Sequence, residues 1–217
     1  MAIPAFDADG KLWSVQYVNS DGSKRFARDS RKEGCFHIVG APYSQNLLST
    51  GADGVARPRP IADLRQAKAL VIAEGYATAA TLKELYNTPS DGEREQLKGD
   101  QTEIYRGVQF IAAFDAGNLP HVASALRERY PDKAIVIAAD NDVSLAEGQG
   151  RNPGLINGQK AAGAIHAELL VPRFSDEEIQ AGMTDFNDLA SHDEVRKSLV
   201  AKELEQALRS KARVEIL

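Results

Sequence analysis

The chain has 217 residues, of which 43% are apolar and 26% are charged, enough for one folded domain with an appendage or for two small domains. Its formal net charge of -5 excludes a uniformly basic nucleic-acid-binding surface, although a local basic patch remains compatible with that sum. Because Cys35 is the single cysteine, we expect no internal disulfide and no zinc site in this chain, and a cytoplasmic location. The first ten residues do not predict a signal peptide, and no apolar run predicts contact with a membrane.

Residues 11–39 predict a small antiparallel β module. Apolar Trp13, Val15 and Tyr17 alternate with polar residues, the segment NSDGS predicts a turn, and KRFA continues the pattern. The module is basic, because Lys24, Arg25, Arg28, Arg31 and Lys32 follow one another closely. These cations either guard a solvated strand edge or contact phosphates. We expect residues 1–60 to comprise this module and a linker, because residues 41–60 are rich in Gly, Pro and Ser.

From residue 61 the pattern alternates between strands and helices, which predicts an α/β fold with a mainly parallel sheet and helices on both faces. The expected strands are 69–73, 108–114 and 134–140, and the expected helices begin near Tyr76, span about 119–129 and cover 160–170. The polar segments 87–107 and 141–159 predict a surface insertion and a long loop. We expect a catalytic domain over residues 61–192 and a helical extension over 193–217.

Acidic residues stand at the carboxyl ends of all three predicted buried strands. They are Glu74, Asp115 and Asp140, and Asp142 adds a fourth carboxylate close to Asp140. In a parallel sheet these ends converge on one edge, where like charges repel unless a cation or proton compensates. Divalent ions such as Mg²⁺ prefer oxygen ligands of this kind. The alternative is that the acids cap turns and helix starts, and for Asp115 this is the favoured interpretation.

The ordered set of motifs resembles the TOPRIM domain shared by bacterial-type primases, topoisomerases and some nucleases. In that resemblance a strand ending in Glu-Gly precedes a strand ending in Asp-x-Asp. More narrowly, EGYATA at 74–79 is similar to a motif of primases encoded by conjugative plasmids, the TraC type. The similarity extends over most of residues 5–190 through DGSKRFARDSRKEGCFHIVG, AADND, NPGLINGQKAAGA and TDFNDL.

The resemblance implies that Glu74, Asp140 and Asp142 are catalytic acids that also bind Mg²⁺, for which Mn²⁺ can substitute. Asp185 in TDFNDL corresponds to a further metal-site acid, with Asp188 as the alternative. Glu74 is either a shared metal ligand or the acceptor of the hydroxyl proton. Template or triphosphate would be held by the basic residues of the β module and by Lys160, which we expect near the start of a helix: Lys24, Arg25, Arg28, Arg31, Lys32 and Lys160.

The implied function is that of the catalytic core of a DNA primase. Such an enzyme makes short RNA primers on single-stranded DNA from ribonucleoside triphosphates by metal-dependent nucleotidyl transfer. Candidate partners are a replicative helicase and a zinc-binding module, which this chain with one cysteine does not contain. Three alternatives stay open: a TOPRIM nuclease that uses the same acids, a non-catalytic nucleic-acid-binding module, and a phosphatase with Asp140 as nucleophile, which leaves Glu74 unexplained.

Overall fold

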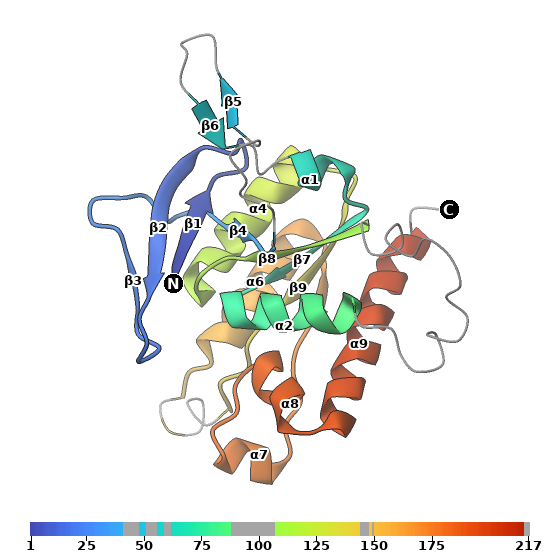
Figure 1. Cartoon of the computed structure of the whole chain (residues 1–217). Helices are drawn as coiled ribbons and strands as arrows, with labels where there is room; N and C mark the ends of the chain where they lie inside the picture. The colour runs from blue at the N-terminus through green and yellow to red at the C-terminus, as the bar shows by residue number, and fades with distance from the viewer. Residues whose placement is uncertain are drawn as a thin grey trace.

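The computed structural model describes residues 1–40, 48–50, 56–58, 62–87, 107–143, 148 and 150–214 (Figure 1). The described strands are β1 (Ala2–Phe6), β2 (Leu12–Val18), β3 (Lys24–Phe26), β4 (His37–Ile38), β5 (Leu48–Thr50), β6 (Ala56–Pro58), β7 (Ala69–Ala73), β8 (Val108–Ala112), β9 (Ala134–Ala138) and β10 (Glu168–Leu170). The described helices are α1 (Ala62–Gln66), α2 (Tyr76–Asn87), the 3-10 helix η3 (Ala116–Asn118), α4 (Leu119–Arg129), α6 (Pro153–Ile165), α7 (Asp176–Gln180), α8 (Phe186–His192) and α9 (Glu194–Val214).

A five-stranded sheet forms the centre of the molecule, with the strand order β10-β9-β7-β8-β4. The pairs β10–β9, β9–β7 and β7–β8 are parallel, and the edge strand β4 is antiparallel to β8. The sheet is therefore mainly parallel, as the sequence predicted, with an antiparallel edge supplied by the N-terminal segment. This architecture is consistent with the TOPRIM-like α/β fold that the sequence suggested.

Helices cover both faces of the central sheet (Figure 1), which explains the uninterrupted apolar strands. Leu70 and Ile72 of β7 belong to a core that includes residues of α1, α4 and α6. Val71 and Ala73 belong to a second core, with residues of α2, α8 and α9 on the opposite face. Successive side chains of a strand point to opposite faces, so a strand buried on both faces needs apolar residues at every position.

The N-terminal strands form the predicted antiparallel module, a sheet of order β1-β2-β3 that lies beside the central sheet (Figure 1). Phe6 and Phe36 exchange two backbone hydrogen bonds of 2.9 and 2.8 Å, which join β1 to the segment before β4. Between the module and α1, β5 and β6 form a separate two-stranded antiparallel sheet. The remainder of the expected linker, and the insertion expected over 87–107 apart from its end residues, lie outside the described residues.

Two expected boundaries on the C-terminal side were wrong. The segment 153–159, expected in a loop, forms the first half of α6, because the Asn152 side chain accepts a hydrogen bond from the Leu155 N–H and Pro153 fits the first helical turn. The segment 166–170, expected to be helical, contains β10 instead. The helix stops at His166, whose left-handed backbone (φ 53°) ends the last turn. The chain then continues into β10, which pairs with β9 in parallel. Strands β8 and β9 also end two residues earlier than expected.

Within the described ranges, no helix combines the length and the apolarity that crossing a bilayer requires.

The packing of α6 on β9 yields a stability prediction. A Cβ atom at Gly158 would lie 2.3 Å from the Ala139 Cβ, so Gly158→Ala should push the helix from the sheet and lower the free energy of unfolding by roughly 1–3 kcal/mol. Gly163 is the matched control on the same helix, because a Cβ there meets nothing within 4 Å. Gly163→Ala should raise stability by roughly 0.5–1 kcal/mol. Urea unfolding of both variants checks this, and equal effects would contradict the close approach.

Candidate functional site

Three carboxylates follow neighbouring strands at the carboxyl edge of the central sheet. Glu74 directly follows β7, while Asp115 follows β8 and Asp140 follows β9 on either side. In the sheet register Ala73 pairs with both Ala112 and Ala138, so the three strands end at the same level. The parallel arrangement thereby brings Glu74 and Asp140 to one edge, as the sequence predicted.

The carboxyl groups of Glu74 and Asp140 are partly removed from water and interact electrostatically with each other. Burial raises the pKa of Glu74 from 4.5 to about 7, with further contributions from the charges of Asp142 and Asp115. Burial likewise raises the pKa of Asp140 from 3.8 to about 9, and the Glu74 charge adds to that rise. A hydrogen bond from the Ala116 backbone opposes the shift at Glu74. The fold therefore places two acids where ionisation is costly.

Two oxygens of this pair are buried without any hydrogen-bond partner among the described residues: Glu74 Oε2 and Asp140 Oδ1. A buried, unpartnered carboxylate oxygen costs free energy, so its retention in a fold calls for a proton or a cation. Within the part of the chain that the structure describes, no three Asp, Glu, His or Cys side chains are grouped closely enough to hold a metal ion. The donor set nevertheless fits Mg²⁺, which commonly takes one or two protein carboxylates and completes its shell with waters and phosphates.

Asp142 is held by a network that connects the loop after β9 to the start of α6. The Asn152 Oδ1 accepts the Asp142 N–H at 3.2 Å and the Leu155 N–H at 3.0 Å. The Asn152 Nδ2 donates to Asn141 Oδ1 at 2.8 Å, and the Asn141 Nδ2 donates to Pro172 O at 2.9 Å. One asparagine side chain thus fixes both the helix start and the backbone between the two aspartates.

A close approach of α6 to Asp140 also constrains this loop. A Cβ atom at Gly154 would lie 2.6 Å from the Asp140 carbonyl oxygen, so glycine is required there. The similarity of NPGLINGQKAAGA to a family motif did not predict a role for Asn152 or Gly154. The available signal was the order Asn-Pro-Gly, which combines a capping residue, a first-turn proline and a small residue.

The TDFNDL segment brings Asp185 into the electrostatic field of Asp140. The charge of Asp185 contributes to the raised pKa of Asp140, and burial raises the pKa of Asp185 itself. Asp185 caps α8 through the Asp188 N–H at 2.8 Å, and the Thr78 hydroxyl donates to its other oxygen at 2.9 Å. The Asp188 Oδ2 instead accepts the Thr184 N–H at 2.8 Å. Thr78, a buried residue of α2, is a further site residue that sequence reasoning missed.

Asp115 has a mixed role. Its Oδ1 accepts the Asn118 N–H at 3.0 Å as the cap of η3, and its Oδ2 forms an ion pair with Lys32 of the N-terminal module. Buried Asn118 reinforces this junction, because its side chain accepts from the Gly34 N–H at 2.8 Å and donates to Cys35 O at 2.9 Å. The capping interpretation that the sequence favoured for Asp115 is confirmed, and the residue also joins the module to the acidic edge.

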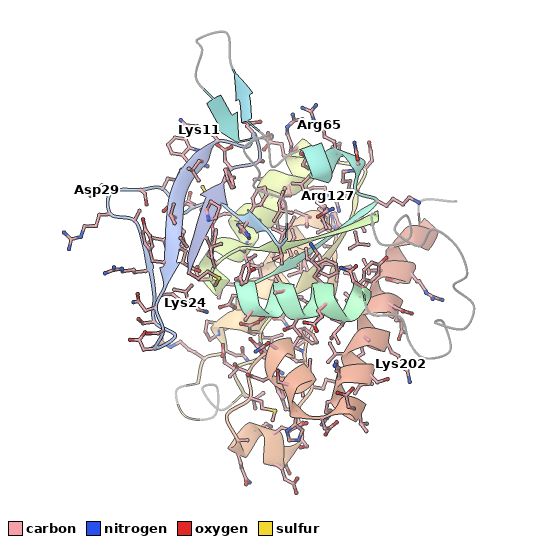
Figure 2. All side chains as sticks on the ribbon, in the orientation of Figure 1. Lys11, Lys24, Asp29, Arg65, Arg127 and Lys202 are labelled. Carbon is pink, nitrogen blue, oxygen red and sulfur yellow. The ribbon has the colours of Figure 1, made fainter. Side chains whose placement is uncertain are left out.

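The basic residues of the module separate into two groups. Lys24 extends from β3 toward the start of α2 (Figure 2), and its charge lowers the pKa of both Glu74 and Asp140. Lys32 reaches Asp115. The exposed residues Arg25 and Arg31 instead lie over aromatic rings of β2, and Arg28 is exposed as well.

Lys160 is exposed in the third turn of α6, because the helix begins at Pro153. The expectation that Lys160 stands near the start of a helix was therefore wrong, although its contact with phosphate stays a prediction.

Two curated relatives align with most of this chain. One DNA primase TraC of Escherichia coli is 44% identical over 173 residues, which are 80% of this chain and 13% of that protein. Another DNA primase TraC of Escherichia coli is 42% identical over 176 residues, 81% of this chain and 10% of that protein. The chain thus spans about an eighth of the first relative and a tenth of the second. No family model matches the sequence.

The buried acids predict a stability that depends on pH when divalent metal is absent. The folded Glu74 carboxyl, with its pKa raised from 4.5 to about 7, and the folded Asp140 carboxyl, with its pKa raised from 3.8 to about 9, each retain a proton in the pH range between these two values, where the unfolded chain has released it. The free energy of unfolding should therefore decrease as pH rises through this window, by roughly 1 kcal/mol per pH unit for one such carboxyl. Asp140→Asn should remove its share of the slope, as measured by urea unfolding in EDTA.

The matched control is Asp21→Asn, because Asp21 is an exposed turn carboxylate whose pKa is lowered from 3.8 by hydrogen bonds from Ser23. Its titration lies below the window, so this variant should keep the parental slope. Parallel stability curves for the parent and Asp140→Asn would contradict the assignment of a buried proton to Asp140.

Proposed function

We propose that this chain is the catalytic core of a DNA primase, which makes short RNA primers on single-stranded DNA by nucleotidyl transfer. The observation that carries the proposal is the pair of buried, unpartnered oxygens, Glu74 Oε2 and Asp140 Oδ1, at the ends of adjacent parallel strands. Their placement supports a site that gains its full complement of contacts when a cation and phosphates are bound. The two aligned relatives, each named DNA primase TraC, support this reaction over the alternatives.

The residues that would hold Mg²⁺, or Mn²⁺ in its place, are Glu74, Asp140, Asp142 and Asp185. A bound divalent ion would neutralise phosphate charge and favour ionisation of the attacking hydroxyl. Asp140 is the central candidate, because the charges of the other three acids all act on it. Asn152 and Thr78 support the site indirectly, since they hold the Asp142 backbone and the Asp185 carboxylate in place.

In the proposed reaction the 3′-hydroxyl of one nucleotide attacks the α-phosphate of a ribonucleoside triphosphate, and pyrophosphate leaves. Glu74 is the candidate acceptor of the hydroxyl proton, because its raised pKa of about 7 lies near the working pH of a general base. Its alternative role is that of a shared metal ligand. Lys24 and Lys32 face the acids from the module and are suited to contact the triphosphate or the template backbone.

The partners of this proposed activity are a single-stranded DNA template and ribonucleoside triphosphates. A replicative helicase is a further proposed partner. A zinc-binding module is another, because complete primases use such a module for template recognition. The nuclease alternative uses the same acids. Its product, a shortened strand, distinguishes it from the primase.

Replacing Glu74 by glutamine tests the chemistry. In an assay with a template, a pre-annealed RNA primer, labelled ribonucleotides and Mg²⁺ or Mn²⁺, Glu74→Gln should lower the rate of nucleotide addition by roughly 10²–10⁴-fold. The variant should remain at least as stable as the parent without metal, because the amide removes repulsion among the acids. Glu128→Gln, at an exposed position of α4, is the control and should add nucleotides at the parental rate.

A folded Glu74→Gln variant that extends primers at the parental rate would contradict the catalytic role of Glu74. Shortening of the template strand by the parent, without extension, would favour the nuclease.

Metal binding is tested separately by thermal unfolding. Mg²⁺ or Mn²⁺ should raise the melting temperature of the parent, because a ligand that binds only the folded state stabilises it. The double variant Asp140→Asn with Asp142→Asn should lose this increase, while Asp115→Asn should retain most of it, because Asp115 already caps η3 and pairs with Lys32. An unchanged metal response in the double variant would move the site elsewhere.

A further inference from the structure

We propose that the outer face of the β1-β2-β3 sheet is a second contact surface for single-stranded nucleic acid, formed by Trp13, Tyr17, Lys11, Arg25 and Arg31. We call these five residues the outer strip. The proposal deepens the proposed function and rests on it for the identity of the ligand. It assigns base contacts to two aromatic residues and places them away from the acidic edge.

The alternation along β2 defines the outer strip. Ser14 and Gln16 are each only 4% exposed and point to the inner face of the small sheet. Tyr17 stands at an alternate position and therefore points to the opposite face, where it is 42% exposed. Trp13 stands where the register between β1 and β2 shifts, and its half-buried ring also packs against the core that contains Ile3, Ala5 and Cys35. The Trp13 Nε1 donates a hydrogen bond to Asp7 Oδ2 at 2.6 Å, which fixes the orientation of the indole ring.

Each aromatic ring of the strip has at least one cation over it. Lys11 Nζ lies 3.7 Å from the centroid of the Trp13 ring, and Arg31 Cζ lies 5.0 Å from the same centroid. Arg25, which is opposite Tyr17 in the strand register, has its Cζ 6.0 Å from the Tyr17 ring. Bases of a single strand stack on aromatic rings and guanidinium planes, and adjacent cations neutralise the phosphates. The strip offers both kinds of contact within one strand pair.

The small sheet separates this strip from the acidic edge. Arg25 lies on the outer face, whereas its neighbours Lys24 and Phe26 point inward. Phe26 packs edge-on against Phe114 at 5.2 Å between ring centroids, and Lys24 acts on the buried acids. In Figure 2, Lys11 and Lys24 mark opposite ends of the module. A strand bound at the acidic edge could therefore continue around the module onto the outer strip.

A single strand is the occupant that fits this chemistry. Duplex bases are paired and stacked on one another, so they do not offer their faces to Trp13 and Tyr17, whereas an unpaired base does. Four residues of an extended strand span about 13 Å, so the two rings are far enough apart to engage separate bases.

The experiment uses the full chain and its single tryptophan, Trp13, as the reporter. Titration with a thymidine oligomer of about 16 nucleotides should change the intrinsic fluorescence saturably. Tyr17→Ala should raise the dissociation constant by roughly 5- to 150-fold through the loss of one stacked base. Arg25→Ala should lower the slope of log affinity against log salt by roughly 0.7.

Two variants serve as controls. Leu12→Ala alters another exposed apolar residue of β2, and Lys202→Ala removes an exposed cation on α9, far from the module (Figure 2). Both should bind the oligomer as the parent does, and circular dichroism should show parental folding for Tyr17→Ala and Arg25→Ala.

Two results would overturn the proposal: binding of a labelled oligomer with no change in Trp13 fluorescence, or equal affinity for a duplex of the same length. The test is separable from that of the proposed function, because it measures binding of the oligomer and requires no nucleotide addition. A parent that gives the fluorescence response but extends no primer would contradict the proposed function and leave the outer strip in place.

Discussion

The central constraint on the structure is a pair of half-buried carboxylic acids, each with one buried oxygen that lacks a hydrogen-bond partner in the described part of the chain. Glu74 Oε2 and Asp140 Oδ1 are buried and have no hydrogen-bond partner among the described residues, and burial raises the pKa of both groups. An arrangement of this kind destabilises the fold whenever the acids ionise. The surrounding loops keep it nevertheless: Asn152 ties the Asp142 backbone to α6, and Thr78 holds Asp185. Such strain concentrated at one edge of a sheet is typical of a site completed by its ligand.

The small N-terminal sheet completes this site rather than standing apart from it. Residues 37–38, which follow the small sheet in the chain, form the antiparallel edge strand of the central sheet, and Asn118 binds the backbone just before that strand. Lys32 reaches Asp115, while Lys24 moderates the acidic pair electrostatically. The module therefore supplies positive charge to the acidic edge.

The net negative charge of the whole chain does not reveal that the N-terminal module is basic. Residues 1–40 contain six Lys and Arg against five Asp and Glu, whereas the whole chain has a net charge of -5. On the module, alternation along β3 sends Lys24 toward the acids and Arg25 away from them. Two cations that are adjacent in sequence thus serve different surfaces, because neighbouring side chains of a strand point to opposite faces.

The sequence by itself determined the parallel sheet, the acids at its carboxyl edge and the hairpin, because uninterrupted and alternating apolar patterns are local signals of burial. It also indicated a cap for Asp115. The tertiary structure alone decided which acids act on one another, that Lys32 pairs with Asp115, and that Asn152 and Gly154 shape the Asp140 loop. It also decided that residues 168–170 join the sheet as β10 instead of continuing a helix. These features depend on contacts between segments distant in sequence, whose packing overrides local propensity and leaves no periodic signal in the chain.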